Sequence, residues 1–246
     1  MGGKETRLNK YLAECGICSR RDADKLIEQG VVSVDGEPAR MGMKVTGQEE
    51  ICVRGKKVSG RDRKVVLAYY KPVGVVCTER DTHAERIIAD EIKYPVHVTY
   101  AGRLDKDSEG LLLLTNDGWL NNAMMRGANG HKKEYIVKVS EEWTQDALEQ
   151  MRQGVWLEEL QRTTMPCEIV QTGPKTIRMV LKQGVNRQIR RMCQTQGYEV
   201  VSLKRTRVIN ITLDGLKPGE YRELTQEELQ ELYRHCGMKY DEKSKI

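Results

Sequence analysis

The stretch AGRLDKDSEGLLLLTNDG, residues 101–118, places five charged side chains within seven positions and follows them with four consecutive leucines. The apolar run predicts a short buried strand that ends in an Asp117-Gly118 turn. The charged residues would then lie in a loop at the mouth of that strand. Such a loop has two interpretations. It could be a cage of carboxylates for a metal ion, or it could hold one carboxylate in position for chemistry.

The metal interpretation fits this loop only in part. A calcium loop of the helix-loop-helix type needs acidic ligands at its first, third and fifth positions, glycine at the sixth and a bidentate Glu at the twelfth. Asp105, Asp107, Glu109 and Gly110 meet the first four requirements, but the twelfth position is Asn116. The leucine run is also strand-like where a helix is required. We therefore expect no metal site.

The other interpretation makes Asp105 the reactive group. An extended backbone would put Arg103 and Asp105 on the same side, and a nearby guanidinium favours the ionised carboxylate. An ionised, positioned carboxylate can act as a nucleophile or stabilise a cationic sugar carbon. The residues alone leave open a glycosidase, which would need a second carboxylate, and an Asp whose salt bridge only fixes the loop.

Composition limits the class of protein. The chain has 246 residues, of which 39% are hydrophobic and 31% charged, as in a soluble globular protein with one large or two unequal domains. We expect a cytoplasmic protein, because the sequence has no apolar run that could span a membrane and no secretory signal. Seven cysteines fit a reducing compartment, and no second ligand pair completes a zinc site with Cys15 and Cys18.

Positive charge is concentrated in two regions, although the net charge of the chain is only +5. Residues 1–64 carry a net charge of +4, and residues 182–207 carry seven Lys or Arg against Glu199 alone. Two separate basic regions suggest a polyanion that contacts the protein in two places. A solvated face balanced by acidic segments elsewhere would give the same charge distribution.

The first sixty residues are predicted to form two short helices followed by a small sheet. Ser19 is expected to cap the second helix, and Asp35-Gly36 is a hairpin signal. Arg20 and Arg21 lie in the first turn of that helix, which is the unfavourable end of the helix dipole for a cation. An anionic partner would explain their position.

The remainder of the chain is rich in strands, with irregularly placed helices and hairpin signals. Asn186 is expected to cap one helix, and Thr225 with Glu228 forms a capping box for another. This pattern predicts an α+β fold with a mixed, mainly antiparallel sheet. The domains that we predict are a module at 1–60, a linker at 61–64, a larger domain at 65–237 and a flexible tail at 238–246.

Several segments resemble the RNA pseudouridine synthases. GRLDKDSEGLLLLTNDG resembles their catalytic motif, G-R-L-D-x-x-S/T-x-G-L, and KPVGVVCT (71–78) resembles their Lys-Pro-x-Gly segment. KEYIVKV (133–139) resembles the Lys-x-Tyr strand, and residues 181–208 resemble the G-x-N-R-Q-I-R-R-M segment with the strand after it. Residues 7–36 resemble the alpha-L RNA-binding module. The chain is most similar to the RsuA branch, and within it to enzymes that modify large-subunit (23S) ribosomal RNA.

This resemblance implies an enzyme that isomerises uridine to pseudouridine in ribosomal RNA without a cofactor. It implies that Asp105 is the nucleophile, that Tyr135 stacks on the target base and that Arg190 pairs with the catalytic Asp. A target in small-subunit RNA or tRNA, and a catalytically silent ribosome-assembly factor, remain as alternatives. We expect a monomer whose partner is ribosomal RNA, tRNA or an assembling ribosomal subunit.

The resemblance also implies a set of RNA contacts. Arg103 is expected to fill the space left by an extruded base or to contact phosphate, and the start of the helix near Asn186 is expected to favour phosphate. The RNA-binding residues that we predict are Arg103, Leu104, Lys106, Asn186, Arg187, Gln188 and Ile189 in the larger domain, and Arg20, Arg21 and Lys25 in the N-terminal module.

Overall fold

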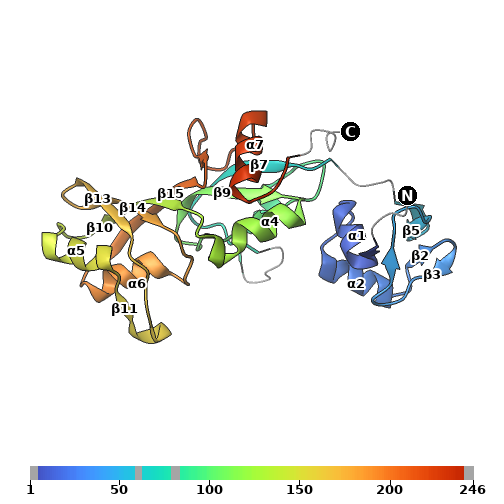
Figure 1. The fold of residues 1–246 in the computed structure, drawn as a ribbon, viewed down its shortest axis with the longest axis horizontal. Helices are drawn as coiled ribbons and strands as arrows, with labels where there is room; N and C mark the ends of the chain where they lie inside the picture. The colour runs from blue at the N-terminus through green and yellow to red at the C-terminus, as the bar shows by residue number, and fades with distance from the viewer. Residues whose placement is uncertain (1–4, 59–62, 79–83, 241–246) are drawn as a thin grey trace.

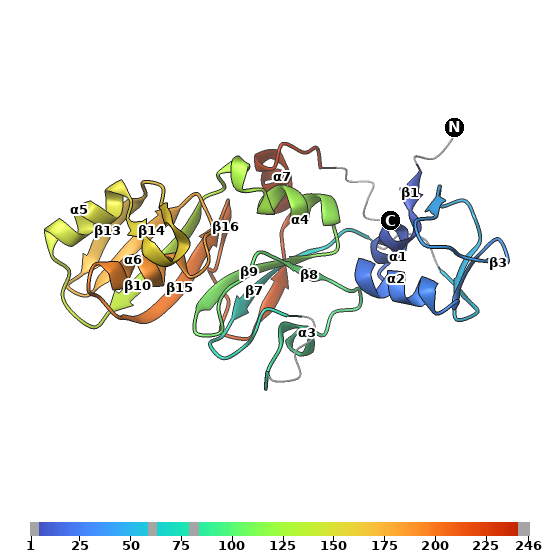
Figure 2. The same ribbon diagram turned by 90° about the horizontal axis from the view of Figure 1, so that it is seen from below.

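The computed structural model describes residues 5–58, 63–78 and 84–240 (Figure 1). Residues 61–62 of the predicted linker and 241–246 of the predicted tail lie outside the described residues. Both ribbon views show the N-terminal module at one end of an elongated molecule and strands β13 and β14 at the other (Figures 1 and 2). Within the described ranges, no helix has the length and apolar character needed to cross a membrane.

The N-terminal module has two helices and two small sheets. Its elements are β1 (Thr6–Arg7), α1 (Leu8–Glu14), α2 (Arg20–Glu28), β2 (Val32–Val34), β3 (Glu37–Pro38), β4 (Lys44–Val45), β5 (Ile51–Val53) and β6 (Lys56–Lys57). Strand β1 pairs with β4, and the other four strands form a sheet in the order β3-β2-β5-β6. Ser19 caps α2 as predicted, because its hydroxyl accepts the backbone N–H of Asp22 at 3.2 Å.

The larger domain is built on one nine-stranded sheet. Its strands are β7 (Val66–Lys71), β8 (Thr99–Ala101), β9 (Glu109–Thr115), β10 (Lys133–Val139), β13 (Glu168–Gly173), β14 (Thr176–Leu181), β15 (Val200–Val208), β16 (Ile211–Thr212) and β17 (Tyr221–Glu223). The strand order is β13-β14-β10-β15-β9-β7-β17, with β16 beside β15 and β8 beside β9. The pairing of β15 with β9 is parallel and the other strand pairs of this sheet are antiparallel, which confirms the predicted α+β fold.

Helices and a separate hairpin complete this domain. They are α3 (Ile88–Glu91), α4 (Gly118–Met125), α5 (Gln145–Gln153), α6 (Gln188–Thr195), α7 (Gln226–His235), the 3-10 turns η1 (Gly127–Asn129) and η2 (Glu158–Leu160), and the pair β11 (Trp156–Leu157) and β12 (Arg162–Thr163). The predicted capping box of Thr225 and Glu228 is present at the start of α7.

Two of the local predictions are wrong. Asp117-Gly118 does not form a turn, because the Asp117 carboxylate accepts the backbone N–H groups of Trp119 and Leu120 and thereby starts helix α4. Asn186 does not cap α6, because the residue at the cap position is Arg187. The Asn186 side chain instead accepts a hydrogen bond from Arg191 at 3.5 Å.

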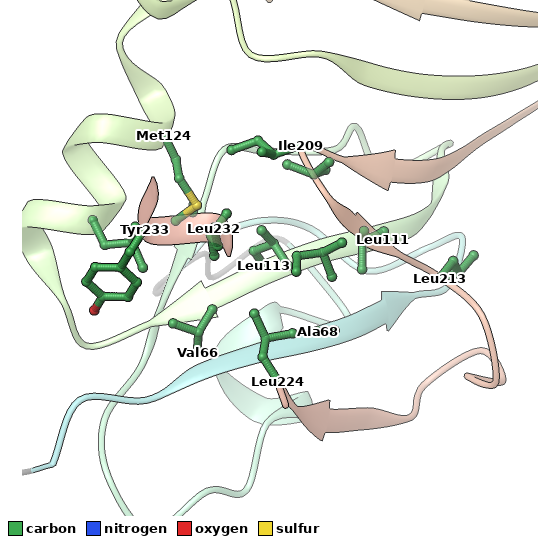
Figure 3. Packing of buried hydrophobic residues seen from close by; sticks show 14 of the residues in the cluster. Val66, Ala68, Leu111, Leu113, Met124, Ile209, Leu213, Leu224, Leu232 and Tyr233 are labelled. Atoms are coloured by element: carbon green, nitrogen blue, oxygen red, sulfur yellow. The ribbon is translucent and has the colours of Figure 1, made fainter. Parts of the chain in front are cut away.

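The four consecutive leucines are buried because β9 is covered on both faces. Leu111 and Leu113 pack into a core with Val66, Ala68, Met124, Leu232 and Tyr233, contributed by β7, α4 and α7 (Figure 3). Leu112 and Leu114 point to the opposite face and pack with Val75, Ile88 and Leu104. Since side chains alternate along a strand, a strand buried on both faces has an unbroken apolar run.

The parallel pairing of β9 and β15 joins the two halves of the sheet over only two register pairs. These pairs are Lys204 with Glu109 and Arg205 with Gly110. A Cβ atom at position 110 would lie 2.2 Å from the carbonyl oxygen of Arg205, so the close approach of the two strands requires glycine there. The loop that carries Asp105 comes directly before this junction.

Candidate active site

The charged loop forms one wall of a cavity of about 350 Å³ where the halves of the sheet meet. The other walls come from the end of α4, the start of β10, the segment 181–189 and β15. This volume lies within the range found for binding sites of small molecules. The cavity brings together these predicted residues: Arg103, Leu104, Asp105, Tyr135, Asn186, Arg187, Gln188 and Ile189.

The remaining predicted residues do not line the cavity. Lys106 is exposed in the same loop, and its carbonyl oxygen accepts the backbone N–H of Gly74 at 2.8 Å. Arg190 lies in the first turn of α6 and contacts the charged loop through the backbone carbonyl of Asp107. Arg20, Arg21 and Lys25 are exposed on α2 in the N-terminal module.

Two buried cations fix the backbone of the charged loop. Arg205 on β15 is 2% exposed and donates from Nε to the carbonyl of Leu111 at 2.7 Å and from a guanidinium nitrogen to the carbonyl of Arg103 at 3.4 Å. Lys71 on β7 is 0% exposed, and its ammonium donates to the carbonyls of Ser108 at 2.7 Å and Pro72 at 2.9 Å. The loop is therefore held on both sides of Asp105.

The acidic side chains of this loop have different partners. Arg187 donates two hydrogen bonds to Asp107, at 2.8 and 3.3 Å, and one of its guanidinium nitrogens lies 3.7 Å from an Asp105 oxygen. Glu109 accepts a hydrogen bond from the hydroxyl of Tyr70 at 3.0 Å. Each of these carboxylates thus lies near a donor of the protein, and among the described residues no group of three or more His, Cys, Asp or Glu side chains could hold a metal ion.

Arg190 occupies a different place from the one that the resemblance implies. Its Nε lies 3.2 Å from Asp107 Oδ2, and its guanidinium donates to the carbonyls of Asp107 at 2.8 Å and Val200 at 3.2 Å. The guanidinium within ion-pair distance of Asp105 belongs to Arg187. Arg190 lies next to Asp107 and not Asp105 because α6 starts at Gln188, and the first turn of this helix directs the Arg190 side chain toward Asp107.

The conformation of Arg187 supports a functional role for this residue. Arg187 has φ 49° and ψ 33°, in the left-handed region that residues with a Cβ atom rarely adopt. Non-glycine residues in this region cost free energy and cluster at binding sites and active sites. Here the turn directs the guanidinium across the cavity mouth toward Asp105 and Asp107.

Electrostatics at the cavity are dominated by cations close to Asp105. Burial lowers the pKa of Lys71, and burial together with the charge of Arg205 lowers the pKa of Lys133, which lines the cavity. Partial burial raises the pKa of Asp107, but the hydrogen bond from Arg187 and the charge of Arg190 outweigh it, so this pKa is lowered overall. The cavity lining holds one carboxylate, that of Asp105, and six basic side chains: Arg103, Arg126, Lys133, Lys182, Arg187 and Arg205. This excess of positive charge favours an anionic ligand such as a phosphodiester.

Tyr135 and Gln188 define the apolar and polar sides of the cavity. Tyr135, on β10, is half-buried and packs against residues from both halves of the sheet. Gln188 is buried, and its side-chain oxygen accepts the backbone N–H of Val185 at 3.3 Å. Its side chain thus shapes the segment before α6, whereas Asn186 and Arg187 are exposed beside it.

Sequence reasoning missed the supporting residues of this site. Arg205 was counted only in the net charge of region 182–207, but it is buried under the charged loop. Lys71 was noted only as part of the Lys-Pro-x-Gly segment. His131 and Lys133 also line the cavity. The apolar run 65–70 before Lys71 is a sequence signal of burial, whereas Arg205 lies between Lys204 and Thr206 and has no such signal.

Comparisons with known proteins agree with this geometry. Residues 65–195 match a family model described as RNA pseudouridylate synthase, and residues 6–51 match the S4 domain. A solved structure titled "Crystal structure of pseudouridylate synthase" superposes with a TM-score of 0.68 at 28% identity, covering 92% of this chain and 99% of that one.

Curated relatives extend over almost the whole chain. The chain is 44% identical over 231 residues to the dual-specificity RNA pseudouridine synthase RluF of Salmonella typhi, covering 93% of this chain and 79% of that protein. It is 37% identical over 232 residues to the ribosomal large subunit pseudouridine synthase B of Bacillus subtilis, covering 92% and 95% of the two chains.

Proposed function

The chain belongs to the RsuA family of RNA pseudouridine synthases, and we propose that it isomerises a uridine of large-subunit ribosomal RNA with Asp105 as the nucleophile. The observation that carries the assignment of Asp105 is its position in the cavity wall, on a loop held from both sides by Arg205 and Lys71. Support for the large subunit comes from the Bacillus subtilis relative, whose name gives that substrate.

The reaction rearranges one nucleotide and needs no external group. The bond between the uracil nitrogen and the ribose carbon breaks, and the base rotates. Uracil carbon five then bonds to the same ribose carbon and loses its proton, while the freed nitrogen takes up a proton. The Asp105 carboxylate either adds to the ribose carbon and leaves when carbon five bonds there, or it accepts a ribose proton and returns it. Both routes begin from an ionised carboxylate directed into the cavity.

The walls of the cavity have separate roles in this reaction. Tyr135 stacks on the target base, and its half-buried ring can hold the base while it rotates. Arg187 orients Asp105 from the opposite wall, and Arg190 acts indirectly by fixing Asp107 and the loop backbone. Arg103, Asn186 and Lys133 contact the phosphates beside the flipped nucleotide.

RNA binding outside the cavity prepares the chemical step. A uridine in folded RNA must first leave its stack, which costs a few kcal/mol, and contacts to the RNA backbone offset this cost. Exposed cations on α2 of the S4 domain supply such contacts away from the cavity. The protein acts as a cytoplasmic monomer that recognises the shape of ribosomal RNA through this domain.

Tritium release from RNA labelled at uracil carbon five tests the proposal. Large-subunit, small-subunit and tRNA transcripts are offered separately to the wild type, to Asp105→Asn and to the matched control Asp107→Asn on the same loop. We expect release from the large-subunit transcript with a product isobaric with uridine. Asp105→Asn should lose at least ~10⁴-fold in rate, the scale seen when a member of a catalytic triad is removed, and Asp107→Asn should lose far less.

Each contrary result of this experiment has a definite meaning. Residual turnover of a few percent in Asp105→Asn would contradict the assignment of the nucleophile. Release of free uracil would indicate a glycosidase. Release from another transcript would move the substrate to small-subunit RNA or tRNA, and tight binding of every transcript without release would indicate an assembly factor.

A further inference from the structure

We propose that Trp119 is a stacking platform for an unpaired RNA base, on a surface shared by the S4 domain and the catalytic domain. This surface, the Trp119 platform, consists of Trp119 with Lys10 and Arg20. The inference rests on the proposed function, because it takes the ligand to be the RNA whose uridine enters the cavity. It adds a second RNA recognition site between the S4 domain and the cavity that contains Asp105.

The indole of Trp119 is exposed although α4 contributes other side chains to the core. Trp119 lies in the first turn of α4 and is 56% exposed, whereas Leu120 and Met124 of the same helix belong to the core. Asp117 fixes the start of the helix by accepting the backbone N–H of Trp119 at 2.9 Å. The backbone at Trp119 is therefore fixed, while more than half of its side-chain surface remains exposed beside the Lys10 ammonium.

Two cations from the S4 domain lie against this turn. The ammonium of Lys10 on α1 lies 4.1 Å from the centroid of the Trp119 ring. The guanidinium of Arg20 on α2 lies 3.8 Å from the position that a Cβ atom on Gly118 would occupy. An exposed aromatic ring beside cations is the combination that proteins use for single-stranded RNA, because bases stack on the ring while cations contact the phosphates.

The platform lies close to the cavity along the same helix. Met124 and Met125 at the other end of α4 line the cavity, and the sulfur of Met125 lies 3.2 Å from the Cβ position of Gly102, just before the charged loop. At about 1.5 Å per residue, Trp119 and Met125 are separated by ~9 Å along the axis. Two or three stacked nucleotides, at about 3.4 Å each, cover this distance. Figure 2 shows α4 in the part of the catalytic domain that is nearer to α1.

A second exposed tryptophan provides an internal control. Trp156 on β11 is 48% exposed, similar to Trp119. Its indole N–H donates to the Glu158 carboxylate at 2.6 Å, and Glu159 follows directly in sequence. The carboxylate on the ring edge repels a phosphate backbone, so Trp156 is expected to make no stacking contact with RNA.

The alternative role of Trp119 is to pack the two domains together through Lys10. Base stacking needs a flat aromatic ring, so Trp119→Phe should preserve RNA affinity while Trp119→Leu should not. A cation–π contact with Lys10 also needs the ring, so the affinities of these two variants do not separate the two roles. Quenching of Trp119 fluorescence by RNA separates them, because only stacking places a base against the indole.

The experiment measures binding of the large-subunit transcript to the full-length protein and its variants. Stacking of one base contributes about 5- to 150-fold in affinity. We therefore expect Trp119→Ala and Trp119→Leu to raise Kd within that range and Trp119→Phe to stay within about threefold of the wild type. Tryptophan fluorescence should be quenched by RNA in the wild type and in Trp156→Phe, and the quenching should be lost in Trp119→Phe.

Equal affinity of the Leu and Phe variants, or unchanged quenching in Trp119→Phe, would overturn the inference. Asp105→Asn separates it from the proposed function, because this variant should keep both the affinity and the quenching while tritium release disappears. Tritium release with an unchanged KM in Trp119→Ala would overturn the platform alone. Quenching by RNA with no release from any transcript would leave the platform and overturn the proposed function.

Discussion

Basic residues in the S4 domain and in the catalytic domain occupy opposite environments. Arg20, Arg21 and Lys25 are exposed on one helix, where a phosphate backbone can reach them. Arg205 and Lys71 are buried under the charged loop and donate to backbone carbonyls. The same residue types thus face solvent in one region and hold a loop in the other, and burial distinguishes the two environments.

The buried cations are tolerated because their donors are satisfied. An isolated buried charge is costly. Here the carbonyl oxygens of Leu111 and Arg103 accept hydrogen bonds from the Arg205 guanidinium. The carbonyl oxygens of Ser108 and Pro72 accept hydrogen bonds from the Lys71 ammonium. The region 182–207 has a net charge of +6 in sequence, yet part of this charge faces inward. Net charge alone therefore overstates the RNA-binding surface of the catalytic domain.

The sharpest test of this contrast is Arg205→Met. Loss of the hydrogen bond to the Arg103 carbonyl should let the charged loop shift, and a shift of about 1 Å in reacting groups can cost ~100-fold in rate. We expect kcat for tritium release to fall by about that factor while the Kd for RNA changes little. Circular dichroism checks that the variant is folded.

Arg205→Lys is the conservative control for this prediction. Lysine keeps the charge but cannot donate to two carbonyls in the fork geometry of arginine, so it should recover only part of kcat. A large rise in Kd with an unchanged kcat would mean instead that Arg205 contacts RNA, and the comparison between the two regions would fail.

The exposed cations are tested by the double substitution Arg20→Gln with Arg21→Gln. Loss of two phosphate contacts should raise Kd roughly 10- to 100-fold at 0.1 M salt and reduce the slope of log K against log salt by about 2, with kcat at saturating RNA unchanged. Lys57→Gln is a matched control, because Lys57 already pairs with Glu50 at 2.8 Å. An unchanged salt slope in the double variant would remove α2 from the RNA-binding surface.

The smallest effect concerns acid stability of the S4 domain. Backbone N–H groups, chiefly that of Thr46, lower the pKa of Glu49 from 4.5 to about 2. A carboxyl group with a lowered pKa stabilises the folded state above its unfolded value, and this contribution is lost as the pH falls from about 4.5 to about 2. Glu49→Gln should therefore lower Tm at pH 7, with a difference that shrinks through this window in thermal scans.

A difference in Tm that stays constant from pH 7 to pH 2 would contradict this account of Glu49. It would mean that the glutamine substitution removes packing and not a charge-assisted hydrogen bond to the Thr46 loop. Scans of the full-length protein at several pH values between these limits distinguish the two cases.

Local signals predicted local structure well. Ser19, Thr225 and the Asp35-Gly36 hairpin behave as their patterns indicate, since caps and turns depend on residues only a few positions apart. Asp117-Gly118 was misassigned because Asp before Gly fits a turn and a helix cap equally well. The strand formed by the leucines was correctly predicted, but the sequence did not show that two different cores cover it.

Long-range partners could not be predicted. The pairing of Arg187 with Asp107 joins residues 80 positions apart, and its register depends on the left-handed turn at Arg187. The burial of Arg205 depends on where β15 meets β9. The motif resemblance could place Asp105, Tyr135 and the segment 181–189 together. It could not show that Arg187 lies next to Asp105 and that Arg190 lies next to Asp107.

The short parallel junction at Gly110 and Arg205 also bears on the order of folding during synthesis. Strands β7, β8 and β9 can pair as soon as residues 66–115 are available, whereas the hydrogen bond from Arg205 to Leu111 closes a separation of 94 positions. Closing so long a loop is slow, because its entropic cost precedes the contacts that offset it. We therefore expect a nascent chain to fold its S4 domain early and to acquire a rigid Asp105 loop only after β15 has left the ribosome.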